Sequence, residues 1–190
     1  MRKLLLAVPV ALLLVPAAAG GEALIRPGKS IAGVALGMSE ADVRAKLGRP
    51  TAAIRRRAGF GRVDVELQFR QADYTVRLAG RPRALRAVAV STILRTERTR
   101  DGLGVGTLER TLLRRLNRSL RCEALRTRRE GAYRVVSYEQ TSRSCVARAA
   151  GGGETAWTTS PRRHRHNKVL TESEWLAEAR VIAVEVRRGS

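Results

Sequence analysis

The residues best suited to chemistry are two histidines, His164 and His166, in the segment "PRRHRHNK". On a strand, a spacing of two residues would place both imidazoles on one face, as a two-ligand metal site requires. No carboxylate or cysteine with ligand spacing lies nearby, and the surrounding cations would repel a metal ion. We therefore expect a solvated hairpin tip at this segment and no metal.

Other catalytic arrangements cannot be assembled either. No G-x-S-x-G nucleophile elbow occurs, and the glycines of "DGLGVG" fit neither the dinucleotide-binding nor the P-loop spacing. Glu40 and Glu109 could be imagined as an acid and base pair. Each, however, stands in the first turn of a predicted helix, where a carboxylate interacts favourably with the helix dipole. We expect no catalytic residue, no cofactor and no enzymatic activity.

The two cysteines, Cys122 and Cys145, suit a single disulfide formed in an oxidising compartment. Two buried free thiols are the alternative. A bridge of this span would stabilise the fold by about 3 kcal/mol in the loop-entropy model.

The first twenty residues have the pattern of a cleaved secretory signal peptide. Arg2 and Lys3 supply a positive start, an apolar run follows, and Ala17 and Ala19 offer small residues for cleavage. The apolar run is shorter than the roughly twenty residues that a membrane span needs. No cysteine follows it to accept a lipid. We expect a soluble mature protein, secreted or held in the cell envelope.

The net charge is extreme, with 37 basic and 17 acidic residues giving +20. Almost all of the basic residues are arginines. A polycationic surface selected for binding polyanions would explain this, and so would a GC-rich coding background. In either case the field around the protein attracts anionic partners.

A turn-and-helix pattern occurs twice, in "GVALGMSEADVRAKLG" and in "LGVGTLERTLLRRL", and the copies align without a gap when Gly37 is set over Gly106. In the first copy, Ser39 and Asp42 have the spacing of a helix capping box. In the second copy Thr107 is the better cap, so we expect that helix to start one residue earlier. The copies also match at other positions, Val34 with Leu103, Leu36 with Val105, Glu40 with Glu109, Val43 with Leu112 and Leu47 with Leu116.

Alternating apolar and polar residues after each helix predict antiparallel strands with one covered and one wet face. In the first unit these are "RVDVELQF", "YTVRL" and "RALRAVAVSTIL"; in the second they are "AYRVVSYEQ", "SCVARA", "ETAWTTS" and "RVIAVEVRR". The sequence thus predicts an α+β fold of tandem duplicated units, each a helix packed on a strand meander. We divide the chain into a signal peptide (1–20), a first unit (21–98) and a second unit (99–190).

The duplicated glycine-turn helix resembles that of the secreted β-lactamase-inhibitor-protein family, and it is also similar to the SmpA/OmlA-like envelope domain, which has one copy. The first resemblance implies tandem units of short helices on a four-stranded antiparallel sheet, with a concave surface that binds protein. It also implies a disulfide in the second unit, where Cys122 and Cys145 stand. The first unit lacks the matching cysteine pair.

Two surfaces are candidates for binding. The wet face of the sheet, with aromatic anchors from the second unit, would dock an extracellular or envelope protein. Core packing is the alternative for both aromatic residues. The candidates for this role are Asp64, Glu66, Gln68, Arg77, Tyr138 and Trp157.

The second candidate surface is a set of arginines repeated along the second helix and in the histidine segment. These arginines could simply form a solvated helix face. The functional alternative is that they bind an anionic cell-wall polymer or a phospholipid headgroup. Nucleic acid is an improbable partner because no recognised motif and few aromatic residues accompany the charge. The residues concerned are Arg110, Arg114, Arg118, Arg162, Arg163 and Arg165.

Overall fold

The computed structural model describes residues 25–116, 119–130, 136–161 and 172–189. The predicted signal peptide and the histidine segment lie outside these residues. The protein is an α+β fold built mainly of antiparallel strands, as predicted.

The first half begins with a small hairpin and a helix, followed by four strands. Its elements are β1 (Ser30–Ile31), β2 (Val34–Ala35), α1 (Glu40–Leu47), β3 (Ala52–Arg57), β4 (Val63–Phe69), the 3₁₀ turn η1 (Arg70–Ala72), β5 (Tyr74–Gly80) and β6 (Arg86–Thr92). The second half has a helix and four strands in the same order, with one further helix before the last strand. Its elements are α2 (Glu109–Leu116), β7 (Leu120–Glu130), β8 (Val136–Arg148), β9 (Gly153–Ser160), α3 (Glu172–Glu178) and β10 (Arg180–Arg188).

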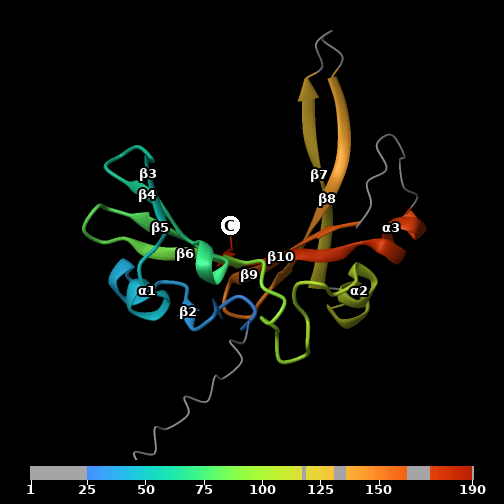
Figure 1. Cartoon of the computed structure of the whole chain (residues 1–190), viewed down its shortest axis with the longest axis horizontal. Helices are drawn as coiled ribbons and strands as arrows, with labels where there is room; N and C mark the ends of the chain where they lie inside the picture. Colours follow the sequence, from blue (N-terminus) through green and yellow to red (C-terminus); the bar gives the residue numbers. More distant parts are fainter. Residues whose placement is uncertain (1–24, 117–118, 131–135, 162–171, 190) are drawn as a thin grey trace, which may run out of the picture.

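All eight long strands form one sheet in the order β3-β4-β5-β6-β10-β9-β8-β7. Each half is an antiparallel meander, and the two meanders join through their last strands, where Val90 pairs with Val186 and Thr92 with Val184. The sheet bends into a U, with α1 and α2 beneath it and the β7–β8 hairpin rising at one end (Figure 1). Among the residues that the structure describes, helices therefore cover one surface of the sheet and leave the other open.

Several strand predictions need correction. The arginine-rich strands β3 and β7, which form the two edges of the sheet, were not predicted at all. Two strands predicted at 132–140 and 144–149 are one long strand, β8, with a bulge near Gln140. The helix α3 was not predicted either.

One hydrophobic cluster lies under the sheet and spans both halves. It is built from every second residue of the strands, as the alternation predicted. Val43 of α1 and Leu112 of α2, which align in the two sequence copies, are both fully buried against it. The helices are short, so this apolar contact with the sheet is what stabilises them.

The two glycine turns have the same geometry. Gly37 and Gly106 have φ angles of 89° and 93°, a region that favours glycine because it has no Cβ atom. The amide of Gly37 donates to the carbonyl of Ala87 in β6, and that of Gly106 donates to Val181 in β10, each at 2.7 Å. Each turn thus fastens its helix to the last strand of its own half.

The helix starts agree with the prediction in the first half only. Ser39 caps α1, its hydroxyl accepting from the amide of Asp42 at 3.2 Å while the Asp42 carboxylate accepts from the Ser39 amide at 3.3 Å. The Ser39 hydroxyl also donates to the Asp42 carboxylate at 2.7 Å, and this hydrogen bond, followed by the one from the Ser39 amide, lowers the pKa of Asp42. Thr107 does not cap α2, because its hydroxyl accepts from the amide of Gly104 instead. Helix α2 consequently starts at Glu109, in step with Glu40, and the predicted shift of one residue is wrong.

Candidate functional site

The open surface of the sheet is the largest feature that the helices leave uncovered (Figure 1). It consists of the residues that alternate with the core positions on the inner strands. These are Asp64, Glu66 and Gln68 of β4, Thr75 and Arg77 of β5, Ala89 and Ser91 of β6, and Glu185 and Arg187 of β10. We call this set the open face.

The open face is hollowed where the two halves meet. A hollow of about 310 Å³ is lined by charged and small residues from four neighbouring strands, and two smaller hollows adjoin it. Small side chains on β6 form its floor, while longer side chains from β4, β5 and β10 surround it. Its lining is Glu66, Thr75, Arg77, Ala89, Ser91 and Glu185.

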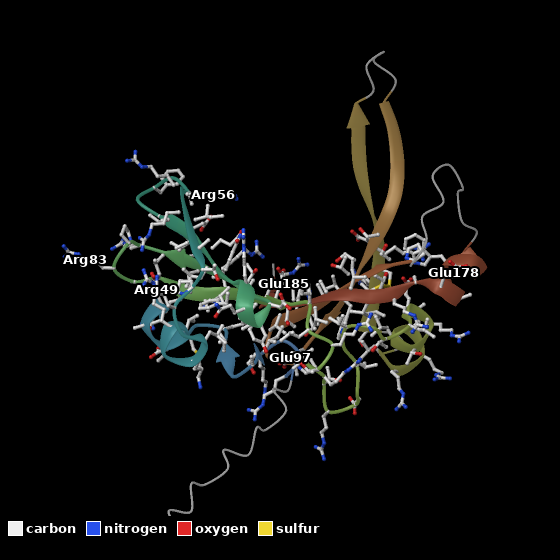
Figure 2. All side chains as sticks on the ribbon, viewed as in Figure 1. Arg49, Arg56, Arg83, Glu97, Glu178 and Glu185 are labelled. Carbon is white, nitrogen blue, oxygen red and sulfur yellow. A yellow bond between two sulfur atoms is a disulfide. The ribbon has the colours of Figure 1, made fainter. Side chains whose placement is uncertain are left out.

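Side chains across the hollow are held in place by charge pairing. Arg77 of β5 and Glu185 of β10 form an ion pair at 3.3 Å, which connects the two halves over the small residues of β6. The amide of Gln68 donates to Glu66 at 2.7 Å. Figure 2 shows Glu185 near the bottom of the U. The surface is therefore polar and of mixed charge, a composition that is common in non-obligate protein interfaces.

Further along the open face, Glu154 of β9 lies between two arginines. It accepts from Arg148 and Arg187, each at 3.2 Å. The hydrogen bond from Arg148 is the largest influence that lowers the pKa of the Glu154 carboxyl, which favours the ionised form.

The structure brings four of the six predicted protein-binding residues together: Asp64, Glu66, Gln68 and Arg77 all lie on the open face and line its hollows. Trp157 does not belong with them. It is fully buried on the core side of β9, opposite Val184 and Cys145, so the core-packing alternative holds. Tyr138 lies in β8, paired with Arg128, and its side chain is outside the described part of the structure.

The predicted polyanion-binding arginines are only partly described. Arg110 and Arg114 are both exposed on α2, beneath the sheet and away from the open face. Arg118, Arg162, Arg163 and Arg165 lie outside the described residues.

The sequence placed Glu109 in the first turn of a helix but did not reveal that its side chain is buried among polar partners. Its side chain is 1% exposed and accepts three hydrogen bonds, from Arg143 at 3.2 Å, Thr159 at 2.5 Å and the indole of Trp175 at 2.7 Å. The Arg143 guanidinium also stacks on the Trp175 ring, 4.7 Å from its centroid. These four residues, which we call the Glu109 cluster, connect α2, β8, β9 and α3. The Glu109 carboxylate is therefore closed off from solvent.

The predicted disulfide between Cys122 and Cys145 is confirmed. Both sulfur atoms lie within 4.8 Å of the Glu109 carboxylate, the one group of three potential metal ligands among the residues described. Sulfur atoms bonded to each other offer no thiolate, and thiolate is the form that binds a metal. This group is therefore structural.

A second buried carboxylate lies under the first half. Glu97 accepts a hydrogen bond from the hydroxyl of Tyr74, and its other oxygen has no hydrogen-bond partner among the described residues. Burial raises the pKa of Glu97, and burial next to that carboxylate also raises the pKa of the Tyr74 phenol. Like Glu109, Glu97 is closed to solvent.

No helix in the described part of the chain is long and apolar enough to cross a bilayer. No protein-family model matches the sequence, and no curated protein matches it. Among solved structures, the chain is similar to the crystal structure of the uncharacterized protein yfeY from Escherichia coli. The identity is 12% over 85% of this chain and 95% of that chain, with a TM-score of 0.46.

Proposed function

We propose that this protein is an exported, non-catalytic binding protein that docks a protein partner on its open face. The observation that carries the proposal is the hollow at the junction of the halves. It combines a concave polar lining with an ion pair between Arg77 and Glu185 that joins the two halves. A polar lining of mixed charge offers complementary groups to a protein partner.

The proposal includes descent of the two halves from one duplicated unit. Its support is the shared order of helix and four strands and the equivalent backbone hydrogen bonds of Gly37 and Gly106. Joining two such units through β6 and β10 produces a longer and more concave surface than one unit offers. We also include the resemblance to the β-lactamase-inhibitor-protein family, because that family binds protein on a concave sheet.

Export is supported by the disulfide, which persists in oxidising compartments and is rare in the cytosol. The N-terminal sequence, with its basic start and short apolar run, supports the same assignment.

The test uses two variants that introduce the same side chain on opposite surfaces. Ser91→Arg would place a long side chain in the hollow beside Glu66 and Glu185, whereas Ala45→Arg adds one on the exposed part of α1. Purified mature protein and both variants are immobilised and incubated with the culture medium and envelope extract. We expect a partner that wild type and Ala45→Arg capture equally and that Ser91→Arg loses about tenfold or more, a cost of about 1.4 kcal/mol.

The washes distinguish the second candidate, an envelope-associated protein that binds anionic polymer or headgroups through arginines such as Arg110 and Arg114. Polyanion binding falls steeply between low and moderate salt. We expect capture to persist at moderate salt. Capture that is lost with salt, or that Ser91→Arg and Ala45→Arg leave equal, would contradict docking on the open face.

A further inference from the structure

The β3–β4 hairpin ends in an aromatic residue with no cover. Phe60 is fully exposed and has a φ of 46°, between Gly59 and Gly61 with φ angles of 76° and 69°. Positive φ is unfavourable for an aromatic residue, so the backbone holds Phe60 outward at a cost in stability. Ile93 and Ile182, exposed by 57% and 48%, are the next most exposed large apolar residues described, and neither stands at a tip.

A dense group of arginines surrounds this phenylalanine. Val63 pairs with Gly80, so the β3–β4 tip lies beside the turn between β5 and β6. Figure 2 shows Arg56 of β3 and Arg83 of the β5–β6 turn at the same end of the molecule. We define the arginine tip as Phe60 with the exposed arginines of β3 and of the two connections, Arg55, Arg56, Arg57, Arg62, Arg81 and Arg83.

Little acidic charge neutralises this group. Arg55 is 3.6 Å from Glu40, and Arg56 is opposite Asp64 in the strand register. No carboxylate within ion-pair distance is found for Arg57, Arg62, Arg81 or Arg83 in the described part of the chain. The arginine tip is therefore a strongly positive surface with one exposed apolar side chain, Phe60, at its end.

Protection of an edge strand explains only part of the tip. Charged residues on β3 would discourage pairing with another chain. The turn between β5 and β6 is not at an edge, however, and an exposed phenylalanine would favour association. A positive surface with an apolar aromatic side chain at its end fits a phospholipid bilayer, where guanidinium groups bind phosphates and phenylalanine side chains enter the boundary between headgroups and acyl chains.

We propose that the arginine tip docks this protein on anionic phospholipid bilayers, with Phe60 entering the headgroup region. The arginines supply attraction to the negative surface, and the phenylalanine supplies the apolar contact that a soluble polyanion cannot accept. The arginine tip adjoins the open face at Arg56, which lines one of the smaller hollows, whereas Phe60, Arg62 and Arg83 line none of the three. The vesicle experiment contains no protein partner, so its outcome does not depend on whether the open face binds one.

The experiment measures sedimentation of the mature protein with vesicles of phosphatidylglycerol and phosphatidylcholine. We expect binding to these vesicles and none to phosphatidylcholine alone. Phe60→Ser should weaken binding about tenfold. Arg56→Gln combined with Arg83→Gln should weaken it about twentyfold.

Two controls are matched to these variants. Ile182→Ser removes an exposed apolar side chain elsewhere, and Arg110→Gln with Arg114→Gln removes the same charge from α2. We expect each control to change binding less than about threefold, because a distant charge is screened. Equal losses from the two arginine pairs would overturn the proposal, since net charge alone would then explain binding.

A Phe60→Trp variant reports insertion directly. The Trp157 and Trp175 side chains are already buried, so a blue shift on adding vesicles would come from the new tryptophan. Polyphosphate serves as the soluble polyanion, and Phe60→Ser should bind it as wild type does. Three results would each overturn the lipid proposal. The first is a Phe60→Trp emission spectrum that vesicles do not shift, and the second is normal vesicle binding by Phe60→Ser. The third is that the wild-type protein forms a dimer without lipid and that Phe60→Ser dissociates it.

Discussion

Replacing Glu109 with alanine should remove a large part of the stability of the second half. The carboxylate is the shared acceptor for Thr159 and Trp175, and both donors are buried. Each buried donor left without an acceptor costs about 1–3 kcal/mol. Arg143, whose side chain is 16% exposed, also loses its ion pair at 3.2 Å. Removing one partner of an ion pair that is largely buried brings the total expected loss of unfolding free energy to about 3–5 kcal/mol.

The first half supplies a matched control. Glu40 occupies the equivalent first position of α1, but its side chain is 22% exposed and its partners are Arg44 at 2.7 Å and Arg55 at 3.6 Å. Exposed pairs of this kind contribute about 0.5 kcal/mol. Since both residues interact with a helix dipole in the same way, the difference between Glu40→Ala and Glu109→Ala isolates the buried cluster.

The assay is equilibrium unfolding in guanidinium chloride, followed by far-ultraviolet circular dichroism with the disulfide intact. Glu109→Gln should fall between wild type and Glu109→Ala, because the amide keeps one acceptor oxygen. That variant also serves if Glu109→Ala does not fold. A Glu109→Ala protein within about 1 kcal/mol of Glu40→Ala would refute the reasoning, because the buried donors would then have found other partners at little cost.

Three further predictions follow from buried or paired groups. Because the pKa of Glu97 is raised in the folded protein, the unfolding free energy should fall as pH rises from the ordinary glutamate pKa through the folded value. Glu97→Gln should remove that slope. Tyr74→Phe should lower the unfolding free energy by about 1–3 kcal/mol. Glu154 has a lowered folded pKa, so its contribution should be lost as pH falls below the ordinary glutamate value, and Glu154→Gln should flatten this acid limb in urea titrations. Replacing Cys122 and Cys145 with serine should lower the unfolding free energy by about 3 kcal/mol, measured in the same titrations, and a loss below about 1 kcal/mol would argue against the loop-entropy estimate.

Most of the strands that the sequence predicted have one buried and one wet face. In β4, Val65 and Leu67 alternate with Asp64 and Glu66, and burial follows that alternation. Trp157 shows where the alternation of apolar and polar residues fails to place a side chain. Its strand carries polar residues on both faces, so the pattern did not fix the phase, and only the pairing with Val184 places the indole in the core.

The Glu109 cluster could not be predicted because its members come from four elements distant in the sequence. The helix carries a carboxylate in its first turn, which is explained locally by the helix dipole. Only the folded chain brings Arg143, Thr159 and Trp175 to that carboxylate. Since α3 was not predicted, no indole was expected beside Glu109.

The arginines are distributed unevenly over the sheet, and the distribution explains why its edges escaped prediction. Strand β3 reads "AAIRRR" and β7 reads "LRCEALRTRRE", whereas the inner strands β4 and β9 contain no arginine and the inner strand β10 contains three. An edge strand has one row of unpaired backbone groups, and long cations along it discourage pairing with another chain. Those same cations interrupt the apolar alternation by which strands are recognised. Protection of the two edges is thus a structural reason for the arginines of β3 and β7, and the arginines of the β5–β6 turn do not share it.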